Sequence, residues 1–306
     1  MKKALTAFLS AIYLCCAGFN TQAQQNNGIA ATTELSSLQD SLLGLSKKII
    51  EARENTARFE QNATFIKTLV QALRLPGSFG FAFDSLDMVS VIKSPDDAVK
   101  LYTWFVPTDE GGFRYFGTIQ LPSKQGEVKL IPLIDQTSNF IDSNAVTEPK
   151  VWFGSRYYDI VPVADGKETY YALLGWKGNN QKTTSKVIEI LSLKGGTATF
   201  GKPVFEQAGK LSTKNRLVFT YNKLNSMTLR FDKKVNMIVC DHLAPYDPAM
   251  QGNYEFYASD SSFDGYQIHK GRLKLVENIE LNNDPDDQDA FYIDPSRKDI
   301  PAKKKF

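Results

Sequence analysis

The segment YYALLGW, residues 170–176, places the strongest constraint on how this chain folds. Alternate side chains of a β-strand point to opposite faces. One face of this segment carries Tyr170, Ala172, Leu174 and Trp176, and the other carries Tyr171, Leu173 and Gly175. Both faces are apolar, and such a strand belongs at the centre of a sheet that is covered on both sides. The sequence therefore predicts a layered β fold with this segment in its core, and it directs the search for binding surfaces to the loops.

A β pattern continues along most of the chain. From about residue 86, short segments rich in Val, Ile, Tyr, Phe and Thr alternate with clusters of Gly, Asp, Asn and Pro, which is typical of strands and hairpin turns. Helical segments do not alternate with these strands, so a doubly wound α/β fold is disfavoured. We expect a mainly β chain, α+β overall, with one large antiparallel domain that is sandwich-like or an irregular meander. A propeller-like arrangement is the alternative, although its candidate blade turns recur at irregular spacings.

A helical segment precedes the β domain. Leu38, Leu42, Leu45 and Ile49 recur every three or four residues, which is the period of an amphipathic helix. A second apolar stripe runs over 65–73 and stops before a Pro-Gly pair, a common end of a helix. We expect one long helix or two shorter ones that form an arm packed on the β domain.

The N-terminus has the pattern of a secretory signal peptide. Lys2 and Lys3 precede an uncharged apolar run that ends at Phe19, and Ala23 is a small residue suited to cleavage. The run is shorter than the roughly 20 apolar residues that a membrane span needs. We therefore expect export to the periplasm, the cell surface or the medium, without a membrane span.

These patterns divide the chain into five parts. They are a signal peptide at 1–23, a flexible start at 24–35, a helical segment at 36–76, an antiparallel β domain at 84–281 and a charged tail at 282–306.

The charge balance argues against nucleic acid as a partner. The chain has 36 Lys and Arg against 34 Asp and Glu, and the signal peptide holds two lysines and no acid, so 34 basic residues face 34 acidic ones after cleavage. Binding through phosphate neutralisation requires a basic surface. Two of the three cysteines, Cys15 and Cys16, also lie in the signal peptide, so Cys240 has no cysteine to pair with and stability must come from the core.

Several segments, in the same order, resemble secreted proteins of Bacteroidota that have no established activity. They are FDSL (83–86), SPDDAVKLYTW (94–104), GGFRYFGTIQ (111–120), YYALLGWKGNN (170–180), FGKPVF (200–205), RLVFTYN (216–222) and SSFDGYQ (261–267). The resemblance covers most of the chain after the signal peptide. It implies export and a β-rich fold, and it transfers no catalytic residue.

Catalytic motifs are scarce. The sequence has neither a G-x-S-x-G elbow nor a phosphate-binding glycine loop. Cys240 and His242 are two residues apart, so they would share one face of a strand as a nucleophile and its base. We interpret Cys240 instead as a small buried apolar residue, and we assign no catalytic residue.

Two local patterns suggest binding or modification. Asp260 and Asp264 are oxygen ligands at a spacing suited to Ca²⁺, although a hairpin turn explains the same Asp and Gly residues. The Asp-Ser-Leu triplet at 84–86 resembles the O-glycosylation sites of Bacteroidota and makes Ser85 the better candidate, whereas Ser41, in the same triplet at 40–42, is expected to be helical.

These observations favour a non-catalytic binding or structural protein of the cell envelope, with a glycan or a protein as its ligand. The alternative is a secreted hydrolase that acts on glycan or peptide through two facing carboxylates. We expect the three tryptophans, Trp104, Trp152 and Trp176, to be core residues rather than a sugar-stacking surface.

Overall fold

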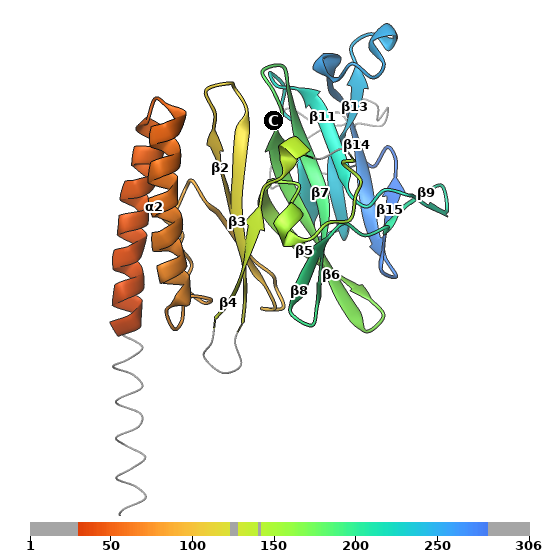
Figure 1. The fold of residues 1–306 in the computed structure, drawn as a ribbon. Coiled ribbons are helices and arrows are strands. Elements are labelled where there is room, and N and C mark those ends of the chain that lie inside the picture. Colours follow the sequence, from red (N-terminus) through yellow and green to blue (C-terminus); the bar gives the residue numbers. More distant parts are fainter. Residues whose placement is uncertain (1–29, 123–127, 140–141, 281–306) are drawn as a thin grey trace, which may run out of the picture.

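A computed structural model describes residues 30–122, 128–139 and 142–280, and it begins with two helices (Figure 1). The first covers 30–51 and the second, α2, covers Asn55–Arg74. The first helix starts within the segment expected to be a flexible start, because Leu35 is buried in the core under the helices. The expected signal peptide at 1–23 and the expected charged tail at 282–306 lie outside the described residues.

The two helices are joined by a tight turn that Arg58 holds in place. Its guanidinium donates hydrogen bonds of 3.0 Å to the carbonyls of Ala52 and Arg53. It also pairs with Asp109 at 2.6 Å. Asp109 follows the second strand, so this arginine fixes the helical turn to the β domain.

Three sheets follow the helices. The helix-side sheet has the order β1-β2-β3-β4, the central sheet β11-β7-β6-β5 with β8 paired to β7, and the outer sheet β10-β9-β15-β14-β13-β12. The strands are β1 (Ser90–Lys93), β2 (Lys100–Pro107), β3 (Phe113–Leu121), β4 (Lys129–Ile134), β5 (Arg156–Asp165), β6 (Glu168–Gly178), β7 (Thr183–Lys194), β8 (Thr197–Phe200), β9 (Phe205–Gln207), β10 (Lys210–Leu211), β11 (Leu217–Asn222), β12 (Leu229–Asp232), β13 (Met237–Pro245), β14 (Tyr257–His269) and β15 (Arg272–Val276). Short 3₁₀ helices are η1 (Thr137–Asn139), η2 (Pro149–Val151), η3 (Pro248–Met250) and η4 (Tyr254–Phe256).

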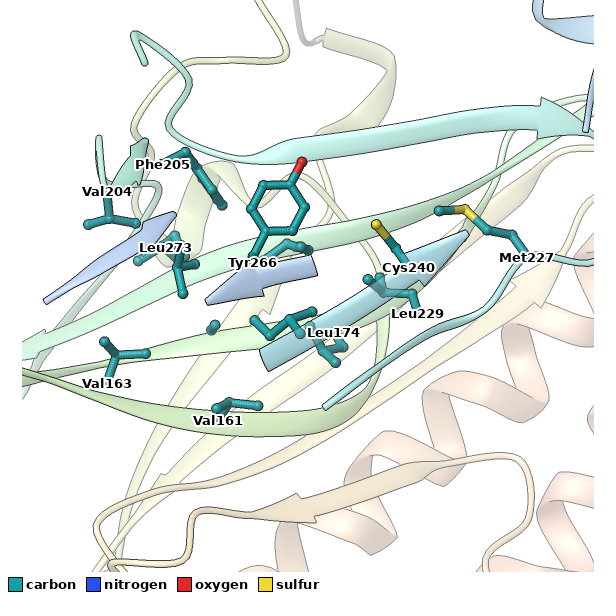
Figure 2. Packing of buried hydrophobic residues seen from close by; sticks show 14 of the residues in the cluster. Val161, Val163, Leu174, Val204, Phe205, Met227, Leu229, Cys240, Tyr266 and Leu273 are labelled. Carbon is teal, nitrogen blue, oxygen red and sulfur yellow. The ribbon is translucent and has the colours of Figure 1, made fainter. Parts of the chain in front are cut away.

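The helices and sheets stack as four layers with three cores between them (Figure 1). Between helices and helix-side sheet, Phe65 of α2 packs edge-on against Trp104 of β2, with ring centroids 5.4 Å apart. Between the helix-side and central sheets, the core includes Leu101, Ile119, Trp152, Leu173 and Leu191. Between the central and outer sheets, it includes Val161, Val163, Leu174, Leu229, Cys240, Tyr266 and Leu273 (Figure 2).

Strand β6 lies inside this stack, as its two apolar faces predict. Tyr171 and Leu173 belong to the core on one side, and Tyr170, Ala172 and Leu174 belong to the core on the other. All five side chains are buried. The prediction of a central strand covered on both sides is confirmed.

The predicted fold class is also confirmed: the chain is mainly β, with helices at its N-terminal side and sandwich-like sheets. The three sheets stack face to face and none is closed in the described residues, which differs from the radial blades of a propeller. One pairing among the described strands departs from an antiparallel meander, because β9 and β15 run parallel. No helix of the described part is long and apolar enough to cross a membrane.

Candidate functional site

A cavity of about 380 Å³ opens where β6 and β11 end and β7 begins. This volume lies within the range of small-molecule sites, roughly 300–1,000 Å³. We call it the end cavity, and its lining residues are Phe113, Trp176, Gly178, Asn180, Thr183, Thr184, Lys186, Tyr221, Lys223, Asn225, Ser226 and Met227.

The position of the end cavity follows from unequal strand lengths. β5 pairs with β6 only as far as Arg156, opposite Trp176, whereas β6 continues to Gly178. The ladder of β7 and β11 reaches still further, to Thr183 opposite Asn222. Leu174 is fully buried while Trp176, two residues along the same face, is half-buried. The packing between layers therefore thins toward this end of the central sheet.

Two half-buried aromatic rings form one wall of the end cavity. Phe113 and Trp176 meet edge to face, with centroids 5.2 Å apart and planes at 82°. The ring of Phe105 packs against both, with its centroid 5.3 Å from that of Phe113 and 5.0 Å from that of Trp176. Gly178 allows this close arrangement, because a Cβ there would collide with both Phe113 and Trp176. The absence of a side chain at this position keeps the rings against the strand.

Two lysines supply positive charge at the end cavity. The ammonium of Lys186 lies 4.5 Å from the ring centroid of Tyr158 and 3.4 Å from its hydroxyl. Burial lowers the pKa of Lys186. Lys223 is exposed, and neither lysine forms an ion pair with a carboxylate of the described residues. Among the described residues, no acid forms an ion pair with the ammonium groups of this cavity.

Thr184 adds a buried polar group without a partner. The residue is 6% exposed, and its hydroxyl has no hydrogen-bond partner in the described part of the protein. A buried polar group left in this state costs about 1–3 kcal/mol. The neighbouring Thr183 differs, because its hydroxyl accepts a 2.8 Å hydrogen bond from Asn179. A polar ligand atom in the cavity would give Thr184 a partner once its side chain rotates.

A buried lysine lies on the opposite face of β6. The ammonium of Lys177 donates to the hydroxyl of Thr137 at 2.8 Å and to the carbonyls of Phe153 and Gly154 at 2.5 and 2.7 Å. Burial lowers its pKa to about 7, and the nearby carboxylates of Asp135 and Glu189 oppose this shift. Its three donors hold the chain around residues 137 and 153–154 against the central sheet.

A second buried group fixes the same region. Arg216 of β11 pairs with Glu189 of β7 at 2.8 Å, and both side chains are almost fully buried. Burial raises the pKa of Glu189, while the positive charge of Arg216 opposes the rise. Arg216 also donates to the carbonyls of Ser143 and Ala145. The ion pair and Lys177 together support the long connection between β4 and β5, and we assign them a structural role.

Cys240 and His242 do not form a catalytic pair. Cys240 is 1% exposed in the core between the central and outer sheets, and burial raises its pKa to about 12. His242 lies at a β-bulge near the surface, where its Nδ1 is 2.8 Å from a carboxylate oxygen of Asp264. This hydrogen bond raises the pKa of His242. The interpretation of Cys240 as a buried apolar residue agrees with its position.

Asp260 and Asp264, the two candidate calcium ligands, each form hydrogen bonds to other protein groups. Asp260 accepts hydrogen bonds from the backbone and hydroxyl of Ser262 at 2.9 and 2.6 Å. Asp264 bonds His242 and accepts from the backbone nitrogen of Asn278 at 3.1 Å. No group of three or more metal-binding side chains occurs in the described ranges. Calcium binding here stays a prediction.

Ser85 lies in an exposed turn between the helices and β1, and the amide of Gln39 is 3.4 Å from its hydroxyl. Ser41 lies in the first helix, as expected, and donates to the carbonyl of Ser37 at 3.0 Å. An exposed turn is accessible to a modifying enzyme, but O-glycosylation of Ser85 stays a prediction.

The tryptophans divide between core and cavity. Trp104 and Trp152 are buried, as predicted. Trp176 is not a full core residue, because it is half-buried and lines the end cavity. Sequence reasoning missed Phe113 and Lys186 as lining residues, because both lie in strands and reach the cavity only through the stacking of separate sheets.

Comparison of the chain with protein-family models, with curated proteins and with solved structures finds no significant match. The resemblance to secreted Bacteroidota proteins therefore stays a prediction.

Proposed function

We propose that this chain is an exported, non-catalytic binding protein whose end cavity holds an acidic sugar unit of a glycan. Export is supported by the signal-peptide pattern of residues 1–23. The ligand class is supported by the chemistry of the cavity, and a glycan is favoured over a protein partner because the cavity has the volume of a small-molecule site.

The observation that carries the proposal is the combination of two aromatic rings with two lysines that form no ion pair among the described residues. Phe113 and Trp176 present apolar ring surface, on which the C–H face of a sugar stacks. Lys186 and Lys223 offer ammonium donors for a carboxylate or sulfate, and such charge-assisted bonds are stronger than neutral ones. Thr184 supplies an unused hydroxyl for a ring substituent.

The same lining does not favour hydrolysis by paired carboxylates. Glycosidases of that kind place two acids on either side of the scissile bond. None of the twelve residues that line the end cavity is Asp or Glu. At this cavity, binding is therefore the better supported function.

A glycan array tests the proposal. The purified protein is applied to neutral glycans, uronate- and sialate-containing glycans and sulfated glycans, and also to peptides, with cleavage read in parallel. We expect binding to acidic glycans. Binding only to neutral glycans or peptides, cleavage of any substrate, or no binding at all would contradict the proposal.

Variants locate the ligand in the end cavity. Lys223→Gln removes an exposed ammonium, so it should fold normally and weaken binding of an acidic glycan by about tenfold, the equivalent of about 1.4 kcal/mol. Gly178→Ala should displace the Phe113 ring and weaken binding as well. Lys210→Gln, an exposed lysine in β10, is the matched control and should bind as the unmodified protein does.

A further inference from the structure

A second cavity, of about 450 Å³, lies between α2 and the helix-side sheet. We call it the helix–sheet groove. Its lining residues are Ile66, Leu69, Val70 and Arg74 of α2, Trp104 of β2, Phe116, Gly117 and Thr118 of β3, and Leu130, Pro132, Leu133 and Ile134 of β4. It shares no residue with the end cavity.

The groove exists because the helices leave the edge strand uncovered. Strand β4 is the last strand of the helix-side sheet, whereas α2 is hydrogen-bonded to Trp104 of β2 and Gln120 of β3. Leu130, Pro132 and Ile134 alternate with residues of the opposite face, so they form one row on the helix side of β4. Ile134 is 43% exposed and Pro132 is exposed. An apolar row therefore faces solvent beside α2.

Two hydrogen bonds between α2 and the helix-side sheet mark the two ends of the groove. At one end Trp104 donates to the amide oxygen of Asn62 at 2.8 Å. At the other end Gln120 donates to the carbonyl of Leu73 at 3.2 Å. Arg74 therefore lies at the Gln120 end. From residue 66 to residue 74 a helix rises about 12 Å, at 1.5 Å per residue.

The groove carries one charged residue. Arg74 is the only ionisable side chain of the twelve lining residues, and it is exposed. It makes no ion pair within the described part of the chain. The carbonyl of Leu73 beside it already accepts hydrogen bonds from Gln120 and Ser78. The guanidinium is thus available for an anion that enters from solvent.

The geometry points to a single-chain fatty acid as the ligand of the helix–sheet groove, with its alkyl chain along β4 and its carboxylate at Arg74. The helix–sheet groove is apolar and has one cation at its end, so it is complementary in charge and polarity to an amphiphile with one anionic head group. A zigzag alkyl chain with C–C bonds of about 1.5 Å advances about 1.25 Å per carbon, so about 12 Å accommodates about ten carbons. A protein partner is less well matched, because stable protein interfaces bury about 800 Å² on each side.

Calorimetry on the full-length protein with saturated fatty acids of increasing length tests this inference. Each added CH₂ group contributes about 0.8 kcal/mol, so affinity should rise about fourfold per carbon and level off near ten to twelve carbons. Dodecanoate should bind at least about tenfold more tightly than dodecanol, because only the acid pairs with Arg74. Equal affinity for the acid and the alcohol would overturn the assignment, as would no binding of either.

Variants separate the groove from the rest of the molecule. Arg74→Gln should remove the preference for the acid over the alcohol and keep chain-length dependence. Ile134→Glu changes a partly exposed residue and should abolish binding of both. Lys67→Gln, an exposed cation on the same helix, is the control and should leave binding unchanged. Fatty-acid binding that survives Ile134→Glu, or a dimer that this variant dissociates, would overturn the inference. These variants should not alter glycan binding at the end cavity.

Discussion

Replacement of Lys177 by methionine should change how the stability of the protein depends on pH. Lys177 is 7% exposed, and its ammonium lies 4.3 and 4.7 Å from the ring centroids of Phe153 and Tyr115. Burial lowers its pKa from 10.5 to about 7, even though Asp135 and Glu189 favour the charged form. The unfolded chain keeps the ordinary pKa, so folding and protonation of this group are linked.

The pKa values of Lys177 in the folded and unfolded chain determine how the free energy of unfolding changes with pH. Between about pH 7 and pH 10.5 the unfolded chain binds a proton at Lys177 that the folded protein does not bind. The free energy of unfolding therefore rises with pH in this window by about 1.4 kcal/mol per pH unit. Below about pH 7 Lys177 is protonated in both the folded and the unfolded chain, so its contribution to the free energy of unfolding no longer changes with pH. Over the interval from about pH 7 to pH 10 the gain is roughly 3.5 kcal/mol, less than the full slope would give because the folded protein is still half protonated at Lys177 near pH 7.

Methionine removes this titration and adds a cost that does not depend on pH. The carbonyl of Gly154 loses its donor, at a cost of about 1–3 kcal/mol. The carbonyl of Phe153 remains 2.9 Å from the hydroxyl of Thr137, whose single proton can be donated either to this carbonyl or to the carboxylate of Asp135. The stability of the unmodified protein should thus increase by roughly 3.5 kcal/mol relative to Lys177→Met as the pH rises from about 7 to 10.

Urea unfolding followed by tryptophan fluorescence, at several pH values across this window, measures the difference. Other titrating groups, such as the buried Lys100, contribute equally to both proteins and cancel. Lys194→Met is the control, because the Lys194 side chain is 89% exposed, and its stability should parallel that of the unmodified protein. Parallel pH curves for the unmodified protein and Lys177→Met would refute the reasoning.

Three further outcomes are expected. Glu189→Gln should lower the free energy of unfolding in urea by about 3–5 kcal/mol, because it leaves Arg216 charged and buried; a loss below about 1 kcal/mol would contradict a buried ion pair. Asp264→Asn should lower the pKa of His242 in an NMR titration, since the Asp264 hydrogen bond is its main cause. The raised pKa stabilises the fold below about pH 6.5, and this contribution fades as pH rises through the folded pKa. Cys240 should react with iodoacetamide only after unfolding, and rapid alkylation of the folded protein would show that it is not buried.

The fold was largely predictable from local patterns. The two apolar faces of 170–176 required packing on both sides, and the structure places β6 between two cores. The apolar stripes and the Pro-Gly stop indicated the helices, and α2 ends at Arg74. Such features depend on residues that are close in sequence, so the spacing of apolar residues and the presence of turn residues are enough to detect them.

The end cavity was not predictable in the same way. Phe113 and Trp176 are far apart in sequence and belong to different sheets, and their contact depends on how those sheets stack. Strand alternation places Trp176 on the same face as Leu174, which suggested that both are core residues. Alternation gives the face of a residue but not how far the covering layer extends. The half-exposure of Trp176 results from the short pairing of β5, which ends opposite it.

The position of both cavities follows from the four-layer stack. A strand with two apolar faces, such as β6, leaves no polar surface in the interior, and the buried polar groups that do occur there, Lys177 and the Glu189–Arg216 pair, are used to hold a loop. The two cavities considered as ligand sites both lie where one layer ends before the next. The end cavity lies beyond Arg156, the first residue of β5, and the helix–sheet groove lies between α2 and the edge strand β4. Apolar surface left open at these edges costs about 25 cal/mol per Å², and a ligand that covers it recovers this free energy.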